Sequence, residues 1–248
     1  MSKDITSILN GWDFEPGKIS VRKIVGLDKQ PKIQLRLDLG LLQMEVVGRP
    51  DGQRPHGCES LLDYHRQRLE GRRDADAFEL SPRECEGLRA EAMMYYHRYL
   101  CEFALEEYDA VLRDAQRNLD VLELCRRHAR TDADRVAMEQ YQPYILMMHT
   151  RAKAMSALKN DDFAAARHAV QEGLARMRSF GEEVSQLEAI ENSPEVAVLR
   201  SLLEEIDQRE PLDPIRAIEA SLAQALADER YEDAAKIRDQ LRLLRGGK

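Results

Sequence analysis

The C-terminal segment, residues 213–245, constrains the fold more than any other part of this chain. Apolar residues recur there at intervals of three or four, in two runs separated by a short polar break at residues 228–230. The runs are Ile215, Ile218, Leu222 and Ala225, followed by Ala234, Ile237, Leu241 and Leu244. Such spacing places each run on one face of a helix, and a short connection folds two helices back antiparallel. The segment is therefore predicted to be a helical hairpin.

Capping signals bound both predicted helices. Asp213-Pro214 combines an N-cap residue with proline at the first helical position. Glu232 and Asp233 place carboxylates in the first turn of the second helix, and Gly246-Gly247 ends it. Small residues at the bend let the two helices approach closely, and Tyr231 is expected to cover this junction. The small residues are Ala225, Ala227, Ala234 and Ala235.

A hairpin of this length is too small to be stable alone. Chains below about 40 residues usually need disulfides, a metal or association to fold. The segment contains no cysteine, so association remains as its source of stability. Another copy of the chain, another protein and the chain's own body are all open as the docking surface.

These residues resemble the UVR motif, named for the excision-repair subunits UvrB and UvrC. The positions that carry the resemblance are Ile218, Leu222, Ala225, Glu229, Tyr231, Glu232, Ala234, Ala235, Arg238, Asp239, Leu241 and Leu244. The resemblance implies a dimerisation or docking element that pairs with a second hairpin. The partner-binding residues that it implies are Ile218, Leu222, Ala225, Tyr231, Ala234, Ile237, Arg238, Leu241 and Leu244.

The remainder of the chain departs from the proteins in which this motif occurs. It lacks the phosphate loop of UvrB and of the Clp-type ATPases. It also lacks the Cys-x-x-Cys pairs of the protein-arginine kinase activator and any match to a UvrC-like nuclease domain. Its four cysteines are scattered without metal-ligand spacing, at Cys58, Cys85, Cys101 and Cys125. We therefore expect a bacterial UVR-containing protein of another architecture.

The N-terminal part is the only β-like part of the sequence. Residues 19–25 read as a strand, and residues 26–31 have turn chemistry. Alternating leucines and isoleucine in residues 33–39 predict a strand with one apolar face. Up to residue 39 the apolar residues occupy odd-numbered positions, and after Gly40 they occupy even-numbered positions. This change predicts a bulge or tight bend into a third strand over residues 42–46. An antiparallel sheet of two or three strands follows, with the helix predicted at 61–69 as the nearest cover for its apolar face.

From Ser81 onward the pattern is helical. Ser81-Pro82-Arg83-Glu84 is a capping box that opens a helix ending near Tyr108, and a second helix runs to about His128. Thr131-Asp132 opens a stretch that Pro143 is expected to kink or divide. Further helices begin after Asp162 and at Ser193-Pro194. The middle resembles tetratricopeptide-type helical pairs, and an ordinary antiparallel bundle is the alternative.

The predicted fold class is α+β and mostly α, in three parts. Residues 1–75 form a small antiparallel sheet plus a helix. Residues 80–207 form a tetratricopeptide-like array of helical hairpins, and residues 213–245 form the UVR-type hairpin.

One loop is a candidate ligand site. Residues 48–57 are rich in glycine and proline, and they carry Arg49, Arg54 and His56, which are suited to gripping an anion. Loops on rigid scaffolds often carry function. The alternative is a plain connection from strand to helix that needs glycine and proline for its path.

The sequence contains no arrangement that indicates catalysis. The six histidines form no metal-type pair, and no nucleophile elbow, zincin motif or dinucleotide fingerprint occurs. In the run 95–99, Tyr96 and Tyr99 are expected to pack between helices. We expect no enzyme activity, no metal and no cofactor.

Composition narrows the classes of partner. The net charge of −8 disfavours primary nucleic-acid binding, which relies on lysine and arginine to neutralise phosphates. A local arginine cluster at residues 66–73 is read as a solvated helix end. No apolar run approaches a membrane span, and Met1–Thr6 shows no signal segment, so the expected location is the cytoplasm.

Three functions are compatible with these observations. The leading interpretation is a non-catalytic adaptor that dimerises or binds a protein bearing a similar hairpin. The first alternative is an accessory factor of bacterial nucleotide excision repair, recruited through the same tail. The second is a ligand-binding or enzymatic N-terminal module that uses the 48–57 loop.

Overall fold

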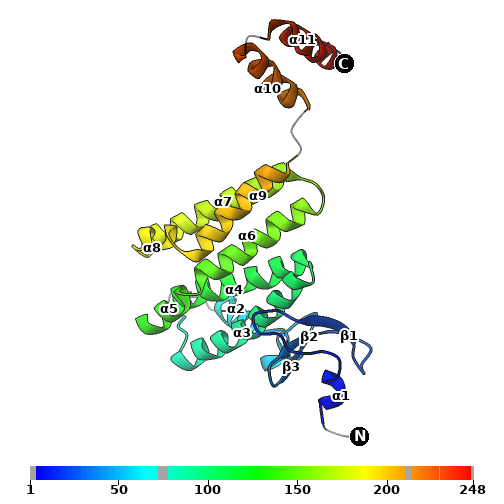
Figure 1. Cartoon of the computed structure of the whole chain (residues 1–248). Coiled ribbons are helices and arrows are strands. Elements are labelled where there is room, and N and C mark those ends of the chain that lie inside the picture. The colour runs from blue at the N-terminus through cyan, green and yellow to red at the C-terminus, as the bar shows by residue number, and fades with distance from the viewer. Residues whose placement is uncertain (1–3, 72–77, 211–213, 229, 247–248) are drawn as a thin grey trace. The chain divides into compact units, whose positions relative to one another are not determined.

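The computed structural model describes residues 4–71, 78–210, 214–228 and 230–246 (Figure 1). The chain divides into two compact units, residues 1–204 and residues 205–248. Each unit is described by itself below. The first unit holds a small sheet followed by a helical array, and the second holds the C-terminal hairpin.

The sheet has three antiparallel strands in the order β1-β2-β3, which are Val21–Val25, Pro31–Leu37 and Gly40–Glu45. A short helix α1, Thr6–Leu9, precedes it. Leu37 pairs with Gly40, so Asp38 and Leu39 form a two-residue turn. The predicted tight bend and the third strand are thus confirmed, but the bend lies at Asp38 and Leu39, so β2 ends at Leu37 and Gly40 already begins β3.

Strand β2 is not the one-faced strand that its alternation predicts. Ile33 and Leu35 are buried, but Lys32 and Gln34 on the other face are buried as well. Lys32 Nζ lies 2.7 Å from Asp28 Oδ2 and also contacts Glu45, so ion pairs cover its head. β2 is the central strand, and side chains of β1, β3 and the turn before β2 therefore shield its polar face.

The apolar face of the sheet packs on helix α3, Pro82–Ala104, and on the residue that follows it. Ile33, Leu35 and Met44 form a cluster with Cys101 of α3, and Leu105 packs against this cluster. The prediction that the helix at 61–69 provides this cover is wrong. That helix, α2 (Leu61–Glu70), packs instead on α3 and on the short 3-10 helix η1, Pro55–Gly57.

The helical array begins with α3 and continues through α4 to α9 (Figure 1). The bounds are α4 Tyr108–His128, α5 Asp132–Glu139, α6 Gln142–Leu158, α7 Phe163–Glu183, α8 Leu187–Glu191 and α9 Pro194–Arg209. Neighbouring long helices pack side by side, α3 on α4, α4 on α6, and α6 on α7. The likeness of this array to tetratricopeptide pairs stays a prediction.

The helix starts agree with their local signals. Ser81 and Glu84 form the predicted capping box, with Ser81 N donating to Glu84 Oε2 at 2.8 Å. The Asp162 carboxylate accepts from Ala165 N at 2.9 Å at the start of α7. Pro143 lies in the first turn of α6, so it divides the predicted stretch into α5 and α6 instead of kinking it.

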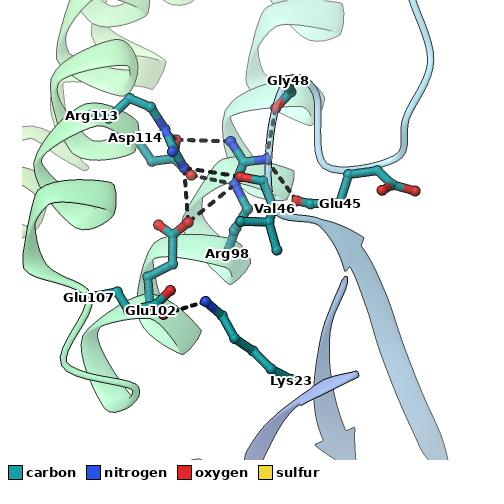
Figure 2. Close-up of polar contacts among 9 residues, drawn as sticks. All are labelled: Lys23, Glu45, Val46, Gly48, Arg98, Glu102, Glu107, Arg113 and Asp114. Carbon is teal, nitrogen blue, oxygen red and sulfur yellow. Dashed lines mark hydrogen bonds and ion pairs between the residues drawn. The ribbon is translucent and has the colours of Figure 1, made fainter. Parts of the chain in front are cut away.

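A buried charged cluster fixes the chain after β3 to the α3–α4 pair (Figure 2). Arg98 is 1% exposed and grips Asp114 through two bonds, Nε to Oδ2 at 2.6 Å and Nη2 to Oδ1 at 2.9 Å. Its Nη1 also donates to the carbonyls of Glu45 at 2.9 Å and Gly48 at 2.7 Å. One guanidinium therefore ties together two helices and a loop.

Glu102 is the second carboxylate of this cluster. It is fully buried, and its Oε1 lies 2.9 Å from Arg113 Nη2 and 3.8 Å from Arg98 Nε. Burial raises the pKa of Glu102 to about 7, and the nearby Asp114 carboxylate pushes it in the same direction.

This pKa shift predicts a pH-dependent stability. The ordinary pKa of the glutamate is 4.5, so between pH 5 and 7 folded Glu102 holds its proton more firmly than the unfolded chain does. The free energy of unfolding is therefore expected to fall as pH rises through this window, by on the order of 2–3 kcal/mol. Glu102→Gln should flatten that slope in urea titrations of the full chain at pH 5, 6, 7 and 8. An unchanged slope would contradict the assignment.

Candidate interaction site

The second unit contains two helices that fold back on each other. They are α10, Pro214–Ala227, and α11, Tyr231–Gly246. The packing of α10 on α11 confirms the predicted hairpin. At the bend, Arg230 N donates to Ala225 O at 2.8 Å, and Ala234 N donates to Arg230 O at 3.0 Å. Asp213, the predicted N-cap, lies outside the described residues.

The interior of the hairpin is built from small side chains near the bend and a leucine farther along. Ala225 is 1% exposed, Ala234 is 4% exposed and Leu241 is 6% exposed. Alanine at the two bend positions allows close backbone approach, as the sequence pattern predicts. Of the other two alanines predicted there, Ala235 is half-buried and Ala227 is exposed.

The remaining apolar positions keep part of their surface in water. Ile218, Leu222 and Ile237 are half-buried. Leu226 is 51% exposed and Tyr231 is 66% exposed. Tyr231, which is expected to cover the bend, covers little of it, because about two-thirds of the residue is exposed. Apolar side chains are thus available to a partner on an otherwise charged hairpin.

The charged groups of the hairpin form local surface pairs. Arg230 lies 3.2 Å from Asp228 and 3.5 Å from Asp233. Arg238 is exposed and lies 3.3 Å from its neighbour Asp239. Such pairs add little stability because water screens them. Of the predicted partner-binding set, the side chain of Leu244 lies outside the described residues.

The three basic side chains of the 48–57 loop have different surroundings. Arg49 Nε lies 3.0 Å from Asp51 Oδ1 and 3.5 Å from Glu91 Oε1. Arg54 is exposed, and the exposed His56 ring stacks on Tyr64 at 4.0 Å. Because Arg49 already faces two carboxylates, an anion at this loop would meet Arg54 and His56 first.

A further buried carboxylate, Glu91, lies next to Arg49 of this loop, and the sequence offered no signal for it. Glu91 is 1% exposed and accepts from Leu61 N, at the start of α2, at 2.9 Å and 3.1 Å. It also contacts Arg117 of α4. A carboxylate from α3 thus caps the N-terminus of α2 by accepting a backbone N–H that has no partner within that helix.

Within the described part of the chain, His, Cys, Asp and Glu side chains form no group of three or more that would suit a metal ion. Among the same residues, none of the helices combines the length and the apolar character needed to cross a membrane.

Comparison with known proteins bears on the hairpin alone. No curated protein and no solved structure matches the chain. Residues 213–246, which include α10, the bend and α11, match the family model of the UvrB/uvrC motif, UVR.

Proposed function

We propose that this protein is a non-catalytic adaptor that docks on a partner, or on a second copy of itself, through the α10–α11 hairpin. The observation that carries the proposal is a compact hairpin unit with apolar side chains left in water. Leu226 and Tyr231 are both more than half exposed after the two helices have packed on each other. The match of residues 213–246 to the UvrB/uvrC motif supports the same reading.

The size of the hairpin also supports docking. Two helices bury one stripe each, and a unit of this length cannot hide enough apolar surface to be stable alone. Ile218, Leu222 and Ile237 remain partly exposed beside the buried contact. Because most of each side chain is already covered, covering the rest would add at most about 1 kcal/mol for each residue. A second hairpin packed against these side chains would supply that cover.

The charge of the hairpin favours a protein partner over nucleic acid. Residues 213–246 contain seven acidic and six basic residues, so the segment has no excess of positive charge. Binding to phosphates requires such an excess. The apolar residues are therefore the stronger recognition feature.

The test is a pair of matched double variants in the full chain. Leu222→Glu with Ile237→Glu places two carboxylates at half-buried positions, one on each helix. Ala223→Glu with Gln240→Glu adds the same charge at exposed positions of the same helices. The first pair is expected to weaken association by about 100-fold or more, and the control pair by less than about threefold.

Light scattering over a concentration series measures self-association, and affinity purification with the hairpin present or deleted measures partner binding. Circular dichroism checks that helix content is retained. Recovery of an excision-repair subunit only with the intact hairpin would assign the partner to the repair alternative. A monomer that recovers the same proteins with and without the hairpin would refute the adaptor proposal.

A further inference from the structure

The two edges of the sheet in the first unit differ in how far they are covered. β1 and β3 are the edge strands, because the strand order is β1-β2-β3. On the β3 side, Glu45 N donates to Pro50 O at 2.8 Å, and Glu45 O accepts from Arg98 Nη1 at 2.9 Å. The loop after β3 and helix α3 thus occupy part of that edge.

The edge of β1 has no such cover. Arg36 N donates to Ser20 O at 2.9 Å, and the antiparallel register continues from this pair along β1. Because hydrogen-bonded and non-bonded pairs alternate, the N–H and C=O groups of Val21, Lys23 and Val25 face away from β2. Beyond β2, no described residue forms a backbone hydrogen bond with these three. Such an edge is a template for another strand.

Apolar side chains accompany the open edge. Val25 is 74% exposed, and Leu27, in the turn after β1, is fully exposed. On the outer face of the sheet, a hollow of about 560 Å³ lies beside β1, and Ile8, Ile24 and Leu27 are among its lining residues. The edge therefore combines open backbone groups with apolar side chains that the chain itself leaves in water, which indicates a surface for association.

The sequence of this edge complements itself around a two-fold axis at Ile24. When two β1 strands pair antiparallel about this axis, Ile24 faces Ile24 of the partner subunit, and Lys23 faces Val25 of the partner subunit. Lys23 and Val25 carry the outward backbone groups, so they form the hydrogen-bonded pairs, and the two isoleucines form a closely spaced non-bonded pair. Val21 then lies level with Leu27 of the partner subunit.

The charges of the edge favour this register over its neighbour. Lys23 pairs with Glu107 of its own chain, so its ammonium is matched and its aliphatic stem is free to lie along an apolar side chain. A register centred on Lys23 would instead place two lysines directly opposite each other, which is destabilising. The axis at Ile24 leaves no like charges opposite each other.

We propose that two copies of this chain pair their β1 strands, antiparallel and centred on Ile24, so that the two sheets become one. A pair of strands this short buries less surface than the roughly 1,200 Å² of a stable interface, so we expect weak, transient pairing. The surface lies in the first unit and does not use the α10–α11 hairpin. It would therefore be a second site of association on the chain.

The test traps the pair through a disulfide in the full chain. Cys58→Ser first removes the cysteine that is not buried, since the other three are buried. In that background, Ile24→Cys places two thiols within bonding reach across the two-fold axis. Val47→Cys, which is 78% exposed just after β3, is the matched control. With oxidised glutathione, non-reducing gel electrophoresis is expected to show about tenfold more dimer for Ile24→Cys than for the control.

Two further arms separate this pairing from other contacts. Adding Leu222→Glu with Ile237→Glu to the cysteine variant alters the hairpin, and the cross-linked dimer is expected to persist. Val25→Pro removes one outward N–H and leaves the bonds to β2, so it is expected to lower the dimer yield about tenfold. Val25→Thr keeps that N–H and is expected to change the yield by less than about threefold.

Circular dichroism checks that each variant is folded. Equal dimer yields for Ile24→Cys and Val47→Cys would overturn the proposal. So would a yield that does not respond to Val25→Pro, or a dimer that disappears with the hairpin substitutions.

Discussion

Asp114→Ala is expected to lower the free energy of unfolding by about 3–5 kcal/mol, because the buried Arg98 guanidinium loses both of its carboxylate hydrogen bonds, and Glu102, 3.8 Å from Arg98 Nε, is too distant to replace them. Arg98 and Asp114 are each 1% exposed, and two bonds of 2.6 Å and 2.9 Å join them. Removing one partner strands a charge that water cannot reach. The loss is measured by urea unfolding of the full chain, followed by circular dichroism.

Two control variants show whether the loss comes from the buried charge. Arg127→Ala removes a partner from an exposed pair with Glu123, at a side chain that is 68% exposed, and is expected to cost less than about 1 kcal/mol. Replacing both buried partners, with Arg98→Met and Asp114→Leu, is expected to recover a large part of the loss, since the guanidinium is then removed together with its carboxylate and Glu102 keeps its contact with Arg113. A loss below about 1 kcal/mol for Asp114→Ala would contradict this role of the pair.

The same variant should loosen one particular segment. Arg98 donates to the carbonyls of Glu45 and Gly48, so its position depends on Asp114 and in turn holds the chain after β3 (Figure 2). Amide hydrogen exchange in residues 45–54 is therefore expected to rise more than exchange in the centre of α7. The cluster thus links the sheet to the helical array.

Features with local causes were readable in the sequence. The Ser81 capping box, the division at Pro143 and the bend before Gly40 each depend on residues within a few positions of one another. The hairpin of α10 and α11 belongs to the same class, since its stripes and its polar break are continuous in the sequence. Periodicity and capping are sufficient for such elements.

Features that depend on distant residues were not readable. Arg98 and Glu102 lie on a helix whose charged residues look like a solvated face, yet both are buried against partners from other elements. The bond from Arg98 to Glu45 O spans 53 residues of sequence. Nothing local to either position indicates that contact. The same holds for Cys101, which covers the sheet in place of the predicted helix at 61–69.

The candidate site was predicted in outline but not in detail. The buried positions of Ala225, Ala234 and Leu241 follow from the helical period. The exposure of Tyr231 does not follow from the helical period, because it depends on how α10 and α11 pack around Ala225 and Ala234. Tyr99 is a similar case. Its packing between helices was expected, whereas its unpaired hydroxyl results from the arrangement of α3 with α4, α5 and α6.

Gly173→Ala is expected to lower the free energy of unfolding by about 3 kcal/mol, although alanine is the better helix former. A Cβ at Gly173 in α7 would lie 2.2 Å from Thr150 Oγ1, 2.3 Å from its Cγ2 and 2.8 Å from its Cβ. Thr150 is 2% exposed on α6 and is branched at Cβ, so it has little freedom to move away. The free-energy cost of overpacking such a helix contact is larger than the gain from replacing glycine with the better helix former alanine.

A second glycine provides the matched control. A Cβ at Gly87 in α3 would meet only Leu61 Cδ1 at 3.4 Å, an ordinary contact, so Gly87→Ala is expected to stabilise the chain by about 0.5–1 kcal/mol. Thr150→Ala combined with Gly173→Ala removes the two nearest atoms and should recover part of the loss in a double-mutant cycle. Opposite signs for the two glycine variants would show that the spacing of α6 and α7 requires glycine at Gly173. If both variants changed the free energy of unfolding in the same direction, Thr150 would have to move aside for the new Cβ, and the array would tolerate a wider α6–α7 spacing.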